Sequence, residues 1–117
     1  MAKSIVLVDD ELEIIAVLSE FLDMIGHKVF QTDSANVALE FCKNNPVDLV
    51  FTDLEMPEMN GYQLSTKIYE LEKNIDIYLL SGFASIIEDD KLIGTGIKRI
   101  LDKPFDIMEI KEIVDDE

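Results

Sequence analysis

The amino-acid sequence predicts an α/β fold with a parallel β-sheet, and three features of the chain indicate it. Strand-like and helix-like segments alternate strictly along the 117 residues. The strand-like runs are continuously aliphatic and β-branched, as at residues 5–8, which is typical of strands covered on both faces. The helix-like segments repeat their apolar residues at intervals of three and four. Such alternation favours right-handed crossovers between parallel strands.

The expected elements follow in order along the chain. Strands are expected at residues 5–8, 28–31, 47–52, 75–80 and 97–101. Five helices are expected between and after them, at about 14–25, 34–43, 62–73, 84–93 and from 105 onward.

Local signals mark where these helices begin and end. Gly26 suits the C-terminal cap of the first helix, and Ser34 is expected to cap the second through its hydroxyl. Pro46 marks the break that follows, and Gly94 and Gly96 close the fourth helix. Apolar residues at helical spacing on the first helix are Ile14, Val17, Leu18, Phe21 and Ile25. Those on the inner side of the second are Ala35, Ala38, Leu39 and Cys42.

Composition limits the classes of partner. The chain carries 25 acidic and 10 basic residues, and its net charge of −15 opposes contact with nucleic acid or anionic membranes. Its single cysteine, Cys42, excludes an internal disulfide and fits a reducing cytosol. No stretch approaches the length of a membrane span or a signal sequence. We therefore expect one cytoplasmic domain, residues 1–117, without direct nucleic-acid or membrane contact.

Polar side chains follow four of the five expected strands. Asp9 and Asp10 follow the first strand, Asp53 the third, Ser81 the fourth and Lys103 the fifth. Ligands of open parallel sheets bind beyond the carboxyl ends of the strands, so these groups are expected to share one crevice. Each has an ordinary alternative, such as a helix N-terminus or a turn. Their joint placement favours a functional site.

This set of side chains has the composition of a phosphoryl-transfer site. Clustered carboxylates repel one another unless a cation joins them, and their oxygens suit Mg²⁺. A carboxylate can attack phosphorus and form an aspartyl phosphate. A lysine and Mg²⁺ can then neutralise charge on the transferred oxygens. The sequence therefore predicts Mg²⁺-dependent phosphoryl transfer to a carboxylate.

The motifs also resemble a known family over nearly the whole chain. They are Val8-Asp9-Asp10, Asp53-Leu54-Glu55-Met56-Pro57 with Gly61, Leu80-Ser81-Gly82, and Leu101-Asp102-Lys103-Pro104-Phe105. In this order and spacing they resemble the receiver domain of two-component response regulators. The resemblance implies a flavodoxin-like, three-layer fold with five helices and a five-stranded parallel sheet of order 2-1-3-4-5.

The resemblance also implies a role for each motif residue. Asp53 matches the phosphoacceptor, and Asp9 and Asp10 match the acidic pair that binds Mg²⁺ directly or through water. The backbone carbonyl of Glu55 matches the third protein ligand of the ion. Ser81 and Lys103 match the hydroxyl and the ammonium that contact the phosphoryl group. The Lys103–Pro104 peptide is expected to be cis, as in the family.

Three positions depart from the family pattern or vary within it. The family often has an aromatic switch residue three positions before the lysine, and Ile100 stands there in this chain. Glu55 adds a fourth side-chain carboxylate near the pocket, and Phe83 follows Ser81 by two positions. In the family, the positions of Glu55 and Phe83 influence the lifetime of the phosphoryl group. His27 falls in an expected connection between elements and is expected to be an exposed loop histidine. It is not expected to be a phosphodonor, because donor histidines belong to partner proteins.

By resemblance, the donor would be a sensor histidine kinase or a phosphotransfer protein. The downstream target would be a protein that binds the fourth helix, the fifth strand and the fifth helix. Two other functions remain open: a Mg²⁺-dependent phosphohydrolase with an aspartyl-phosphate intermediate, and a pseudo-receiver that only binds proteins. A flavodoxin-type cofactor carrier is disfavoured, because Asp9, Asp10 and Glu11 would repel a flavin phosphate.

Overall fold

The central sheet has five parallel strands in the order β2-β1-β3-β4-β5, as expected. A computed structural model describes residues 2–82 and 92–116. Its strands are β1 (Ser4–Val8), β2 (Lys28–Thr32), β3 (Leu49–Asp53), β4 (Asp76–Ser81) and β5 (Ile97–Asp102). The inner strands β1 and β3 are buried almost throughout, which accounts for their continuous apolar runs.

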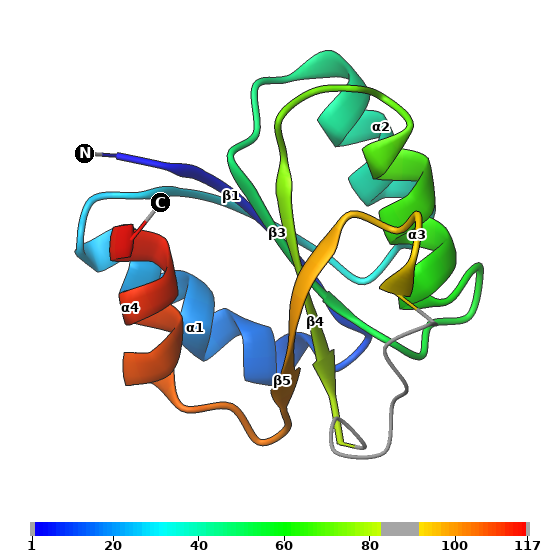
Figure 1. Cartoon of the computed structure of the whole chain (residues 1–117). Coiled ribbons are helices and arrows are strands. Elements are labelled where there is room, and N and C mark those ends of the chain that lie inside the picture. The colour runs from blue at the N-terminus through cyan, green and yellow to red at the C-terminus, as the bar shows by residue number, and fades with distance from the viewer. Residues whose placement is uncertain (1, 83–91, 117) are drawn as a thin grey trace.

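Two pairs of helices cover the two faces of the sheet (Figure 1). Helices α1 (Leu12–Met24) and α4 (Ile107–Asp116) lie on one face, and α2 (Ala35–Asn44) and α3 (Gly61–Tyr69) on the other. The described ranges contain these four helices, whereas five were expected. The missing one, at 84–93, falls almost wholly in residues 83–91, outside the described part of the chain.

Each face of the sheet has its own apolar core. The core under α1 and α4 contains Leu18 and Phe51, and the core under α2 and α3 contains Val50 and Cys42. As expected, Ser34 caps α2, because its hydroxyl accepts a hydrogen bond from Val37 N at 3.2 Å. Ala35, Ala38 and Cys42 are fully buried, so the inner face predicted for this helix is confirmed.

The sheet covers only part of the apolar surface that the sequence indicates on α1. The buried residues are Ile15, Leu18 and Leu22, whereas Ile14 and Val17 are 40% and 58% exposed. The apolar residues of this helix span a wide arc, and spacing alone does not tell which stripe the sheet covers. Ile14 and Val17 instead line a shallow apolar groove beside the loop that follows β5.

Two further expectations need correction. Helix α3 ends at Tyr69 rather than near residue 73, because the chain leaves helical geometry and Glu72 adopts a positive φ of 55°. His27 is buried, not exposed. Its Nδ1 accepts a hydrogen bond from Lys3 N at 3.0 Å, which holds the ring against the N-terminal strand.

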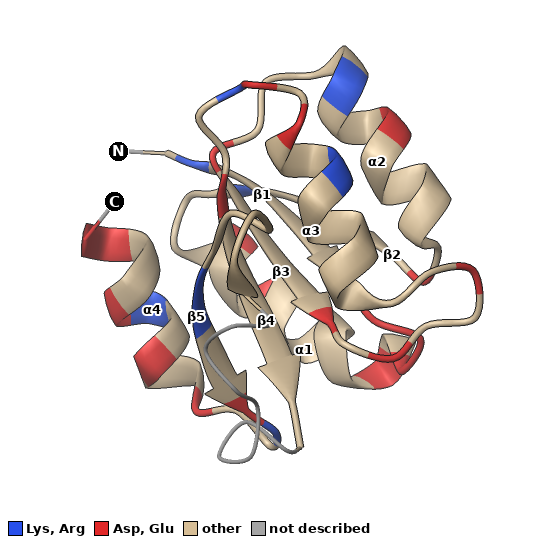
Figure 2. Ribbon diagram, turned by 45° about the vertical axis from the view of Figure 1, so that its right-hand side comes forward, with Lys and Arg blue, Asp and Glu red and all other residues tan. Residues whose placement is uncertain are grey.

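No helix within the described ranges is both long enough and apolar enough to cross a membrane. In Figure 2, acidic positions are seen along α4 and on the loops after β1 and β3. The two loops lie at the carboxyl edge of the sheet.

Candidate functional site

The side chains expected at the strand ends do converge at one edge of the sheet. Side chains alternate along a strand, so Asp53 emerges on the same face as Phe51, toward α1 and α4. Asp9 and Lys103 emerge on this face too, since Lys103 Nζ lies 2.6 Å from Asp9 Oδ2 and 3.3 Å from Asp53 Oδ1. Parallel strands thus bring together residues that are far apart along the chain.

Three carboxylates form the acidic centre of this site. One oxygen each of Asp9, Asp10 and Asp53 lies within 4.8 Å of the others. Asp9 is fully buried and Asp10 is exposed, so the cluster reaches from the protein interior to solvent. Carboxylate oxygens at this spacing are the donors that Mg²⁺ prefers.

The two carboxylate oxygens of Asp9 have different contacts. Its Oδ1 accepts a hydrogen bond from Glu11 N at 2.9 Å, and its backbone N donates to Thr32 O at 3.1 Å. Its Oδ2 forms the short ion pair with Lys103 but has no well-aligned hydrogen bond within the described part of the chain. A buried carboxylate oxygen with an ionic contact alone fits a cation site, so the residues present suit Mg²⁺.

The Lys103 ammonium balances the carboxylates. Burial by itself would lower the pKa of Lys103, but Asp9 and then Asp53 outweigh burial and raise it. Glu11 adds a longer ion pair at 3.6 Å. The lysine therefore stays protonated between three acidic groups.

Asp53 has an unusual electrostatic environment. Burial, and then the neighbouring Asp9 carboxylate, raise its pKa, whereas Lys103 and the Leu54 N–H oppose that rise. The Leu54 N–H donates to Asp53 Oδ1 at 2.9 Å, and Lys103 contacts the same oxygen. Among the described residues, both contacts therefore go to Oδ1, and Oδ2 is the oxygen left for an incoming group.

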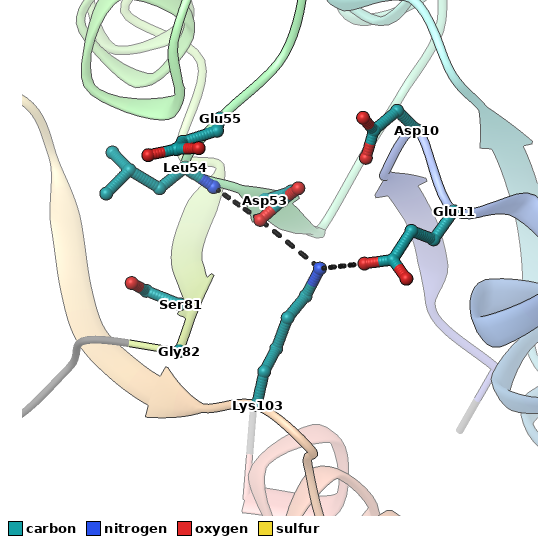
Figure 3. Close-up of a pocket in the computed structure, with 8 residues that line it drawn as sticks. All are labelled: Asp10, Glu11, Asp53, Leu54, Glu55, Ser81, Gly82 and Lys103. Carbon is teal, nitrogen blue, oxygen red and sulfur yellow. Dashed lines mark hydrogen bonds and ion pairs between the residues drawn. The ribbon is translucent and has the colours of Figure 1, made fainter.

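A pocket of about 280 Å³ opens over these groups. It is lined by Asp10, Glu11, Asp53, Leu54, Glu55, Ser81, Gly82 and Lys103. In Figure 3, Asp53 lies at the centre, and Ser81 lies across the pocket from Asp10 and Glu11. Most of the residues that line the pocket carry a charged or hydroxyl side chain, so it suits a small charged group.

Helix α3 begins directly against the backbone of Asp53. A methyl group added at Gly61 would lie 2.6 Å from Asp53 O and 2.5 Å from the Leu79 side chain. Only glycine allows this close approach. Gly61 N also donates to Leu54 O at 2.7 Å, which closes the β3–α3 loop.

The other expected positions are placed as follows. Glu55 is exposed at the rim of the pocket, and Ile100 is half-buried on β5 in register with Leu79. The Lys103–Pro104 peptide bond is cis. Phe83 lies outside the described residues. The sequence placed Glu11 with Asp9 and Asp10 at the end of the first strand but assigned it no role in phosphoryl transfer. In the structure Glu11 lines the pocket and forms an ion pair with Lys103.

Removing the Asp53 charge should stabilise the metal-free protein at neutral pH. Because the folded-state pKa of Asp53 is raised, the folded protein binds this proton more tightly than the unfolded chain. The resulting stability is present below the unfolded pKa and is lost as the pH rises through the folded value. We expect metal-free Asp53→Asn to unfold with a free energy higher by on the order of 1 kcal/mol at neutral pH.

Urea unfolding with a chelator, at neutral pH and in acid, checks this. The difference should close below about pH 4, where carboxylates are protonated in both states. Equal stability of the two proteins at neutral pH would contradict the repulsion inferred for this cluster.

Comparison with known proteins places the chain in a family. The family model described as "Response regulator receiver domain" matches residues 5–115. The DNA-binding transcriptional regulator NtrC of Azospirillum brasilense is 31% identical over 114 residues, which are 97% of this chain but 24% of that protein. Sporulation initiation phosphotransferase F of Bacillus subtilis is 28% identical, with 97% of this chain and 92% of that protein covered.

A solved structure supports the same assignment. The response regulator protein TrrA of Thermotoga maritima, in complex with Mg²⁺-BeF, superposes with a TM-score of 0.84 at 29% identity. The match covers 97% of each chain. The sheet order, the acidic strand ends with Lys103, and the family match over almost every residue agree. This chain belongs to the response regulator receiver domain family and is a receiver domain of two-component signalling.

Proposed function

We propose that this receiver domain accepts a phosphoryl group on Asp53 in a Mg²⁺-dependent reaction. The observation that carries the proposal is the placement of the Asp53 carboxylate. It lies in a polar pocket between two further aspartates and Lys103, with Oδ2 left for an incoming group. The donor would be the phosphohistidine of a sensor histidine kinase or of a phosphotransfer protein.

The reaction is a displacement at phosphorus. An Asp53 oxygen forms the new P–O bond while the P–N bond to the donor imidazole breaks. The electron pair of that bond goes to the imidazole nitrogen, which takes up a proton. Burial suits Asp53 for this role, because a carboxylate with little hydration is a better nucleophile than a fully solvated one.

The surrounding side chains and the metal ion would balance the negative charge of the phosphoryl group. Lys103, already 3.3 Å from Asp53, would pair with a phosphoryl oxygen as the transfer proceeds. Ser81, across the pocket, would donate its hydroxyl to another. Asp9, Asp10, Asp53 and the Glu55 carbonyl would hold Mg²⁺. When bound, the ion would supply the positive charge and oxygen coordination that a phosphoryl group needs.

Incubation with a small phosphodonor tests the proposal. We expect acetyl phosphate with Mg²⁺ to add one phosphoryl group per chain, seen by intact mass, and a chelator to prevent the addition. No mass increase with Mg²⁺ present would contradict the proposal and would favour the pseudo-receiver. Steady release of phosphate over many turnovers, without a labelled intermediate, would instead favour the phosphohydrolase.

The phosphorylated domain would act through a protein-binding surface. We assign this surface to β5 and α4, together with the segment 84–93, most of which lies outside the described residues. Ser81 stands at the end of β4 beside β5, so a change at the pocket has a short route to this face. Ile100, where the family often has an aromatic, implies a switch that does not depend on rotation of an aromatic ring.

A further inference from the structure

One carboxylate outside the pocket joins the β3–α3 loop, which contributes Leu54 and Glu55 to the pocket, to the β2–α2 turn. Glu58 lies in the β3–α3 loop, and its side chain reaches the N-terminus of α2. Glu58 Oε1 accepts hydrogen bonds from Ser34 Oγ at 2.7 Å and from Asn36 N at 3.5 Å. Glu58 Oε2 accepts one from Asn36 Nδ2 at 2.9 Å. These donors, with Ser34 first, hold the pKa of Glu58 below its usual range, so it is a carboxylate at neutral pH.

The contacts continue from Glu58 to the acidic centre. Ser34 N donates to Thr32 Oγ1 at 3.1 Å, and Thr32 O accepts from Asp9 N at 3.1 Å. On the other side, two residues separate Glu58 from Glu55, whose carbonyl is the proposed third ligand. A continuous path therefore runs from Asp9, through the β2–α2 turn and Glu58, back to the loop that follows Asp53.

The rest of the β3–α3 loop is anchored in a different way. Its two ends are joined by the Gly61 N to Leu54 O hydrogen bond, and Met56 and Met59 pack on the core beneath α2 and α3. The hydrogen bond fixes the two ends of the loop, and the two methionines hold the loop against the core. Within the described residues, Glu58 supplies the polar contact that fixes the middle of the loop against the β2–α2 turn.

We propose that Glu58 is a positioning residue for the metal site: it braces the β3–α3 loop against the β2–α2 turn and thereby sets where the Glu55 carbonyl lies relative to Asp9 and Asp53. This inference rests on the proposed function. It predicts an effect on ion selectivity, because Mg²⁺ demands near-ideal octahedral geometry, whereas Ca²⁺ accepts longer and more variable bonds. A looser loop should therefore weaken Mg²⁺ binding more than Ca²⁺ binding.

Calorimetric titration of the chain with Mg²⁺ alone and with Ca²⁺ alone provides the test. We expect Glu58→Ala to weaken Mg²⁺ binding by about tenfold, the scale seen when an outer-shell partner is lost, with a much smaller change for Ca²⁺. Glu58→Gln keeps one oxygen that can accept from Ser34, so it should recover part of the affinity. Rescue by this variant separates positioning from the loss of a distant negative charge.

Two further variants serve as controls. Glu20→Gln removes the same charge from an exposed position on α1 and should leave both affinities unchanged. Asn36→Ala removes one donor to Glu58, so in the Glu58→Ala background it should add nothing further. This second comparison also keeps the test informative if Glu58→Ala folds poorly, because Asn36→Ala alone should still lower the Mg²⁺ affinity.

Three outcomes would overturn the inference: an unchanged Mg²⁺ affinity in Glu58→Ala, an equal loss for the two ions, or a Glu58→Gln variant as impaired as Glu58→Ala. A wild-type chain that binds no Mg²⁺ would overturn the proposed function, and this inference with it. A wild-type chain that binds Mg²⁺ and is phosphorylated, with no effect of the Glu58 variants, would overturn the positioning role alone.

Discussion

Asp53→Asn should abolish labelling by acetyl phosphate, with the whole mass increment lost. The amide keeps the size and the Leu54 N–H contact of the aspartate, so the fold should persist, but its oxygen is too weakly nucleophilic to attack phosphorus. Intact mass after incubation with Mg²⁺ measures the result. Folding of the variant is checked in parallel by its unfolding transition, which should shift to higher stability.

A matched aspartate variant makes this result specific. Asp23→Asn removes one negative charge from an exposed position on α1, and its labelling should equal that of the wild type. Undiminished labelling of Asp53→Asn would show that another residue accepts the phosphoryl group, and peptide mapping would then locate it. Such a result would remove Asp53 from its proposed role while leaving the family assignment intact.

Lys103→Met should be the most destabilising change at the site when no metal is present. It leaves the fully buried Asp9 facing Asp53 without the ammonium that lies 2.6 Å from Asp9. Removing one partner of a buried ion pair costs about 3–5 kcal/mol, and we expect about 2–3 kcal/mol here because this site opens to solvent. Added Mg²⁺ should restore part of the loss, since it binds the folded state alone.

Urea unfolding with a chelator and across a Mg²⁺ titration measures both effects. Lys111→Met is the matched control, because Lys111 forms an exposed ion pair with Asp115 on α4. Exposed pairs of this kind contribute about 0–1 kcal/mol, so the control should change little. A Lys103→Met protein as stable as wild type without metal would show that Asp9 and Asp53 do not need the lysine for charge balance.

The strand ends are the part of the molecule that the sequence predicts well. Parallel strands all present their carboxyl ends at one edge, so a polar residue just after an apolar run is placed in space by topology alone. Asp9, Asp53, Ser81 and Lys103 needed no knowledge of side-chain packing to be assigned to one site. The capping role of Ser34 was equally predictable, because a helix cap depends on only a few neighbouring residues.

Features that depend on distant neighbours were not predictable in this way. Which apolar residues of α1 are buried depends on the rotation of the helix about its axis against the sheet. The sequence does not reveal this rotation, because the exposed Ile14 is as apolar as the buried Ile15. His27 is buried, and its ring accepts a hydrogen bond from the backbone amide of Lys3, 24 positions away. Glu58 has the appearance of a loop residue in the sequence, and only the tertiary fold brings it to Ser34 and Asn36.

Because Cys42 is buried beneath α2, its reactivity reports when this helix separates from the sheet. Its thiol is fully buried on the inner side of α2, and burial raises its pKa to about 11 despite the opposing charge of Lys73. Thiol reagents react with the thiolate form of cysteine. In the folded protein Cys42 is protected in two ways: the reagent cannot reach the buried sulfur, and the raised pKa keeps the thiol protonated. The only cysteine in the chain therefore becomes reactive when the layer beneath α2 opens. The rate of Cys42 modification therefore measures the opening of this layer separately from events in the pocket at the carboxyl edge of the sheet.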